Sequence, residues 1–138
     1  MLKLVLFTIL TVSSSFANST VTNSVVILVL GDSLTAGYGL AQEDSFPRQL
    51  ENSLSTSGYH VTVINAGVSG DTSAGGLARL EWALEVNPQI VLVELGANDA
   101  LRGLDPAQTY DNLDQILVRL KKAGCRIVFA GMRAPRNL

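Results

Sequence analysis

Three short loops in the sequence combine glycine with small polar residues, and each follows an apolar segment. They are Gly31-Asp32-Ser33-Leu34, Gly67-Val68-Ser69-Gly70-Asp71-Thr72 and Gly96-Ala97-Asn98-Asp99. Acyl transfer requires a nucleophile and hydrogen-bond donors aimed at the developing oxyanion, and glycine lets a backbone approach a ligand closely. We interpret Ser33 as the nucleophile. Its own N–H, the N–H of Gly70 and the side-chain amide of Asn98 are the candidate oxyanion donors.

Each of these polar residues also has a structural interpretation. From position alone, an ordinary helix N-cap or turn serine describes Ser33 about as well as a nucleophile does. The occurrence of three such loops shifts the balance toward chemistry. For Asp32 and Asp99 the structural interpretation is preferred, since aspartates in loops commonly accept hydrogen bonds from nearby backbone.

Four apolar segments must position these loops, and they alternate with helical patterns. Residues 25–30, 61–65, 90–95 and 126–130 are rich in β-branched and other apolar side chains, as expected for buried parallel strands. The resulting βαβαβαβ order predicts an α/β fold with three α/β/α layers and a flavodoxin-like parallel sheet. Ligands of such sheets bind beyond the carboxyl ends of the strands, which is where all three loops emerge.

Three longer helices are predicted between the strands. The first is capped by Ser45, has Pro47 in its first turn and ends at Gly58, with Phe46, Leu50 and Leu54 on one face. The second begins near residues 71–73 and stops before Pro88; it carries Leu77, Ala78, Leu80, Trp82 and Leu84. The third begins at Asp105-Pro106 and ends at Gly124, and its predicted buried stripe is Tyr110, Leu113, Leu117 and Leu120.

Long blocks of the sequence resemble the GDSL/SGNH hydrolase family, specifically its bacterial periplasmic thioesterase–lysophospholipase–arylesterase branch. The blocks are GDSLTAGYGL at 31–40, INAGVSGDTSAGGLARL at 64–80, VLVELGANDALRG at 91–103, and the terminal GMRAPRN. The resemblance implies a serine ester hydrolase with Ser33 as nucleophile and Gly70 and Asn98 completing the oxyanion hole. It also implies small esters, acyl thioesters or lysophospholipids as substrates.

The catalytic base is the point at which the sequence departs from the family. The family's fourth block is an Asp-x-x-His whose histidine activates the serine, and no such block occurs before Leu138. The single histidine, His60, precedes the second strand, so a strand length of about 15–20 Å separates it from Ser33, whereas a base must come within about 3 Å of the proton. We expect His60 to be a surface residue and the chain, truncated after an exposed fourth strand, to have weak or no esterase activity alone.

Three apolar residues flank the predicted rim of the site. Tyr38, Leu101 and Leu104 either contact an acyl chain of the substrate or belong to the core beneath the loops, and the sequence favours neither.

The beginning of the sequence is typical of a secretory signal peptide. Lys3 precedes an apolar run at residues 4–12, and Ser15-Phe16-Ala17 offers small residues at a cleavage site. A buried N-terminal strand or helix is the alternative; the run is too short for a membrane-spanning helix. We therefore expect a signal peptide at 1–17, a hydrolase domain at 18–138, a periplasmic or secreted location, no stable membrane anchor and a monomer.

Composition excludes several other classes of protein. With 47% hydrophobic and 16% charged residues among 138, the chain is expected to fold as one globular domain. The net charge of −2 and the absence of a basic stripe argue against nucleic acid as a partner. His60 has no companion at metal-ligand spacing and Cys125 is the only cysteine, so no metal, cofactor or disulfide is expected. Cys125 is interpreted as an apolar residue that begins a buried strand.

Two alternative functions remain compatible with the same pattern. One is a non-catalytic secreted module of the same fold that binds lipids or esters. The other is a flavodoxin-like binder of nucleotides or phosphate, which is disfavoured because no G-x-G-x-x-G motif or Walker lysine follows the first strand.

Overall fold

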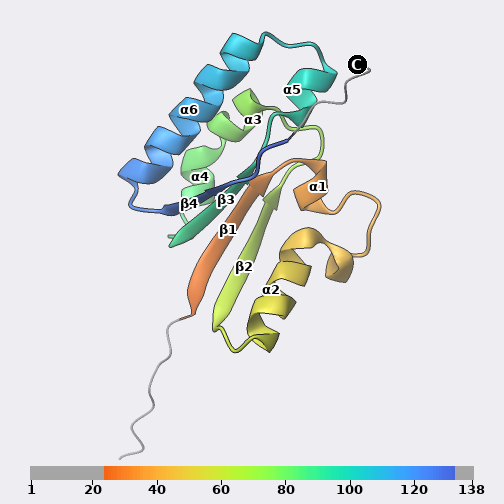
Figure 1. The fold of residues 1–138 in the computed structure, drawn as a ribbon, viewed down its shortest axis with the longest axis vertical. Coiled ribbons are helices and arrows are strands. Elements are labelled where there is room, and N and C mark those ends of the chain that lie inside the picture. The colour runs from red at the N-terminus through yellow and green to blue at the C-terminus, as the bar shows by residue number, and fades with distance from the viewer. Residues whose placement is uncertain (1–23, 133–138) are drawn as a thin grey trace, which may run out of the picture.

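A computed structural model of the chain describes residues 24–132; the predicted signal peptide at 1–17 and most of the terminal GMRAPRN block lie outside them. Its centre is a four-stranded parallel sheet in the order β2-β1-β3-β4 (Figure 1). The strands are β1 (Val25–Gly31), β2 (Val61–Gly67), β3 (Ile90–Glu94) and β4 (Arg126–Phe129). This order matches the first four strands of a flavodoxin-like sheet, and the predicted α/β fold is confirmed.

Helices cover both faces of the sheet (Figure 1). One face carries α1 (Ser33–Ala36), the 3₁₀ turn η1 (Gln42–Asp44) and α2 (Phe46–Thr56). The other carries α3 (Ser73–Ala78), α4 (Leu80–Leu84) and α6 (Pro106–Lys122), while α5 (Ala97–Leu101) lies at the end of the sheet. Among residues 24–132, no helix combines the length and apolar character needed to cross a membrane.

The main hydrophobic core lies between the sheet and α4 and α6. Alternate residues of β1 and β3 point to this face because side chains alternate along a strand. Full burial of a leucine or isoleucine side chain stabilises the fold by about 1.5–3 kcal/mol. The most completely buried members are Leu28, Leu30, Val91, Val93, Leu80, Ile116 and Leu120.

The predicted helix between the second and third strands is divided in two. Arg79, with φ −100° and ψ 4°, separates α3 from α4. Glycine is a poor helix former, and the Gly75-Gly76 pair weakens α3. In α4, Trp82 faces solvent with 68% of its surface exposed. The helices α1 and α5 were not predicted, because four or five residues are too few to show a helical period.

The predicted buried stripe of α6 is wrong at Tyr110, which is 70% exposed. The helix begins as predicted, with Asp105 accepting a hydrogen bond from the N–H of Ala107. In its first turns, however, the inward positions are taken by the polar residues Thr109 and Asn112, which bond to α5 and α3. Apolar packing starts only at Leu113 and Ile116, so Tyr110 turns outward. Phe46 at the start of α2 is likewise 45% exposed.

The strand β4 forms one edge of the sheet. Val128 and Phe129 are 51% and 46% exposed, which confirms the expected exposure of this strand. The prediction that Cys125 begins a buried strand is therefore wrong. Cys125 is half-buried just before β4, where its thiol donates to the carbonyl of Pro88 and where burial raises its pKa.

Candidate active site

The three polar loops meet at one end of the sheet because their strands end level with one another. Gly31 at the end of β1 pairs with Gly67 of β2 on one side and with Glu94 of β3 on the other. The loops that follow therefore start side by side, and α1 and α5 lie at the same end of the sheet (Figure 1). The structure thus brings the segments of Ser33, Gly70 and Asn98 together.

Ser33 is half-buried and is the first residue of α1. The preceding residue, Asp32, is 1% exposed and caps the helix, with Oδ1 accepting from the N–H of Leu34 at 3.0 Å. Its Oδ2 accepts from Nδ2 of Asn98 at 3.2 Å. The preferred interpretation of Asp32, hydrogen bonding to loop backbone, is confirmed, and the second bond ties the loop of Ser33 to that of Asn98.

Gly70 occupies the third position of a tight turn. The N–H of Asp71 donates to the carbonyl of Val68 at 3.0 Å, and Gly70 has φ +82°. Since Ser69 is not among the described residues with positive φ, this is a type II turn, in which the third position favours glycine. Among residues 24–132, the N–H of Gly70 donates to no hydrogen-bond acceptor. Arg102 donates from Nη2 to the carbonyl of Gly70.

Asn98 lies on α5 and bridges the two other loops. Its Nδ2 donates to the carbonyl of Asp71 at 2.8 Å as well as to Asp32. The short helix is itself anchored by Asp99, which is 3% exposed and accepts from the N–H of Ser73 at 2.8 Å and from its hydroxyl. Hydrogen bonding to backbone is therefore confirmed for Asp99 too, and it fixes α5 against α3.

Glu94 is a half-buried carboxyl under the loop of Ser33 that sequence reasoning did not single out. Its Oε2 accepts from the hydroxyl of Thr35 at 2.9 Å and, at 3.5 Å, from the N–H of Asp32. Burial raises the pKa of Glu94; the hydrogen bond from Thr35 opposes this rise, and the nearby charge of Asp32 adds to it. A side chain at Gly31 has no room here, because its Cβ would lie 2.0 Å from the Thr35 hydroxyl. The feature of the sequence that could have pointed to Glu94 is a carboxylate within the otherwise apolar run at residues 90–95.

His60 lies far from Ser33, as predicted. It is exposed, it directly precedes β2, and its carbonyl accepts from the N–H of Val25 at the start of β1. It therefore sits at the opposite end of these strands and is excluded as the base. Within the described part of the chain, no group of three or more His, Cys, Asp or Glu residues is placed to hold a metal ion.

The three apolar rim residues are exposed rather than packed in the core. Tyr38 is 79% exposed, Leu101 69% and Leu104 38%. This rules out a core role for Tyr38 and Leu101, and leaves Leu104 at the border of the surface.

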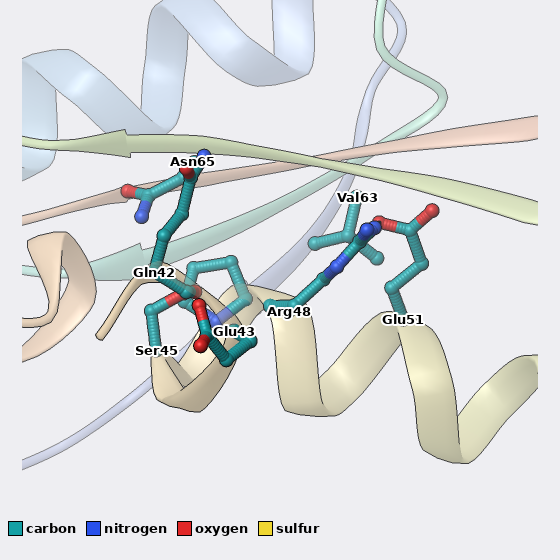
Figure 2. Close-up of a pocket in the computed structure, with 8 residues that line it drawn as sticks. Gln42, Glu43, Ser45, Arg48, Glu51, Val63 and Asn65 are labelled. Carbon is teal, nitrogen blue, oxygen red and sulfur yellow. The ribbon is translucent and has the colours of Figure 1, made fainter. Parts of the chain in front are cut away.

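A separate cavity of about 470 Å³ lies between β2 and the segment η1–α2, away from the three loops. Figure 2 shows its polar lining, with Arg48 and Glu51 of α2 on the side of Val63 and Gln42 on the side of Asn65. None of its lining residues belongs to the loops of Ser33, Gly70 or Asn98. The candidate active site at the ends of the strands is thus distinct from this cavity.

A model of the GDSL-like lipase/acylhydrolase family matches residues 29–138. An arylesterase of Vibrio mimicus is 43% identical over 138 residues, covering 99% of this chain and 66% of the relative. Esterase TesA of Pseudomonas aeruginosa is 43% identical over 112 residues, covering 80% and 56%. The thioesterase 1/protease 1/lysophospholipase L1 of Escherichia coli is 44% identical over 112 residues, covering 80% and 52%.

Solved structures show the same relationship. AlinE4, an esterase of the SGNH-hydrolase family, superposes with a TM-score of 0.80 at 49% identity, covering 83% of this chain and 62% of that one. The chain belongs to the GDSL-like lipase/acylhydrolase family. It spans about half to two thirds of the length of the relatives it matches.

Proposed function

We propose that this chain carries the nucleophile and the oxyanion hole of a serine ester hydrolase. The observation that supports this most directly is the convergence of Ser33, Gly70 and Asn98 at the level ends of β1, β2 and β3. The relatives are named as an arylesterase, an esterase and a thioesterase/lysophospholipase, which agrees with this chemistry.

In the proposed reaction the Ser33 hydroxyl attacks the carbonyl carbon of the ester and loses its proton to a base. The carbonyl oxygen becomes an oxyanion that accepts from the N–H groups of Ser33 and Gly70 and from Nδ2 of Asn98. Of the two bonds that Asn98 donates, the longer one to Asp32 is the one that an oxyanion replaces. The tetrahedral intermediate then expels the alcohol or thiol, leaving the acyl group on Ser33 for hydrolysis by water.

The single histidine of the sequence, His60, lies at the opposite end of the sheet and cannot act as the base for Ser33. A serine hydroxyl without a base is a weak nucleophile. We therefore expect slow acylation of Ser33 by an activated ester and still slower hydrolysis. Rapid turnover of p-nitrophenyl acetate by the purified chain, abolished in Ser33→Ala, would show that the expectation of weak activity is wrong.

Mass spectrometry after incubation with p-nitrophenyl acetate tests the proposal directly. An acetyl group is expected on Ser33 and is expected to be absent from Ser33→Ala. Loss of one oxyanion donor in Asn98→Ala should slow acylation about 100- to 1000-fold. Asn52→Ala, an exposed asparagine on α2, is the matched control and should acylate at the wild-type rate.

Two results contradict the proposal. One is labelling of the chain that is unchanged in Ser33→Ala. The other is binding of a lysophospholipid or ester with no acylation of Ser33, which favours the alternative of a non-catalytic lipid- or ester-binding module.

For the substrate, we propose that Tyr38, Leu101 and Leu104 contact the acyl chain. Their exposure beside the loops supports this, because exposed apolar side chains gain from covering by an apolar ligand. Replacing Leu104 by Asp should slow acylation by decanoyl esters more than by acetyl esters. An equal loss with both esters argues against contact with the acyl chain, and Val118→Asp, on the exposed side of α6, serves as the control.

A further inference from the structure

Arg79 is a partly buried cation that the proposed reaction does not use. It lies between α3 and α4, and only 18% of its side chain is exposed. Its Nε donates to Oδ2 of Asp71 at 2.7 Å, and its Nη2 donates to the carbonyl of Gly31 at 3.0 Å. One guanidinium group therefore contacts the end of β1 and the loop after β2 at the same time.

The carbonyl of Gly31 belongs to the peptide bond that enters the loop of Ser33. It accepts from Arg79 and, at 3.0 Å, from the N–H of Val68. The other side of the same peptide bond, the N–H of Asp32, faces Oε2 of Glu94 at 3.5 Å. A cation and a carboxyl thus hold this peptide from its two sides, immediately before the nucleophile.

Asp71 connects the same guanidinium to the oxyanion donors. It follows Gly70 directly, its N–H closes the turn that contains Gly70, and its carbonyl accepts from Nδ2 of Asn98 at 2.8 Å. Its carboxylate is paired with Arg79. Asp71 thus links the guanidinium of Arg79 to both donors through one residue.

We propose that Arg79 is a positioning residue that sets the loop of Ser33 at a fixed distance from the donors Gly70 and Asn98. This inference rests on the proposed function, because it assigns a role within that site. Arginine suits the role, since its planar fork donates in two directions at once. A lysine at this position has a single nitrogen, which cannot occupy the places of both Nε and Nη2.

Support of the fold alone explains this arrangement poorly. Nη1 of Arg79 is buried without a hydrogen-bond partner among residues 24–132. Buried ion pairs generally contribute little stability compared with apolar side chains of the same size. Nε and Nη2 of Arg79 donate to Asp71 and to Gly31, next to the loops of the proposed site. Nη1 has no partner among residues 24–132.

The test compares Arg79→Lys with Arg119→Lys, whose exposed guanidinium lies 3.6 Å from Glu81 on the surface. The maximal rate of Ser33 acylation and the half-saturating concentration of p-nitrophenyl acetate are measured for each. Arg79→Lys should lower the maximal rate about 10- to 100-fold, as expected for a small misplacement of reacting groups, with the half-saturating concentration nearly unchanged. Arg119→Lys should match the wild type. Millimolar guanidinium should partly restore the rate of Arg79→Ala, and methylammonium should not.

Three results overturn the proposal. They are a wild-type acylation rate in Arg79→Lys, a rate that falls only in proportion to the fraction of unfolded protein seen by circular dichroism, and equal rescue by both cations.

If the wild type shows no acylation of Ser33, the proposed function fails. The positioning role is then decided by NMR: the Nδ2H₂ signal of Asn98 and the amide signal of Gly70 should shift in Arg79→Lys but not in Arg119→Lys, and unshifted signals overturn it.

Discussion

Asp32 does two tasks with one carboxylate. It caps α1 through Oδ1 and holds the amide of Asn98 through Oδ2, so the orientation of a proposed oxyanion donor depends on the residue next to the nucleophile. Sequence reasoning predicted that Asp32 bonds to loop backbone, because aspartates in loops commonly accept hydrogen bonds from nearby N–H groups. It did not identify the second bond, since a partner 66 positions away is set only by the pairing of β1 with β3.

The half-buried carboxyl of Glu94 should make stability depend on pH. Burial raises its pKa above the ordinary 4.5, so the folded chain binds this proton more tightly than the unfolded chain does. The unfolding free energy should therefore fall as the pH rises through and above that value. The Glu94→Gln variant has no such carboxyl to ionise. Its unfolding free energy, compared with that of the wild type, should therefore increase between about pH 4 and about pH 7.

Urea unfolding of both proteins at several pH values measures this difference. Glu81→Gln is the control, because the side chain of Glu81 is 76% exposed. If the curves of Glu94→Gln and wild type stay parallel over the whole pH range, the carboxyl does not titrate as proposed.

At the scale of elements, sequence pattern was most informative for strands and long helices. The four apolar runs became the four strands, because buried parallel strands need continuous apolar sequence. The short helices α1 and α5 and the break at Arg79 were not foreseen. They depend on side-chain hydrogen bonds to distant residues and not on a local period, as the anchoring of α5 through Asp99 and Ser73 shows.

The turn at residues 68–71 should tolerate no side chain at its third position. An alanine at φ +82° is strained, and Gly70→Ala should cost about 1–2 kcal/mol of stability. It should also slow acylation of Ser33 at least about tenfold, because the strained turn moves the donor N–H. Thermal unfolding and the acylation rate measure the two effects.

Gly58→Ala provides the matched control for this turn. Gly58 has φ +87° and open space around its missing side chain, so the backbone strain is similar and the site is not affected. Similar stability losses with a rate loss only in Gly70→Ala support the assignment. Equal acylation rates in the two variants would remove Gly70 from the proposed oxyanion hole.

For the whole molecule, the position of the site was predictable although its internal contacts were not. A parallel sheet brings all its carboxyl ends to one edge, so three glycine-containing loops after three strands had to meet there. The hydrogen-bond partners of Arg79 and Glu94 could be identified only from the structure, since a charged residue in a helix or strand does not indicate which residues it faces. Both residues interrupt apolar surroundings, and that interruption was the signal available in the sequence.

We also propose that the protein is exported and cleaved after Ala17. The lysine and apolar run of residues 1–12 support this, as does the small-residue pattern at Ser15 and Ala17. Expression in a bacterium followed by mass measurement of the periplasmic fraction should give a chain that begins at Asn18. A product that starts at Met1 in the cytoplasmic fraction argues against export.

The level ends of β1, β2 and β3 also bear on when the chemistry becomes available during synthesis. Ser33 leaves the ribosome first, Gly70 later and Asn98 last, and each follows a different strand. A nascent chain that has made only β1 and β2 holds a serine with an incomplete set of donors. The complete oxyanion hole can assemble only after α5 has emerged and β3 has paired with β1, so the growing chain carries no complete set of donors until its third strand is in place.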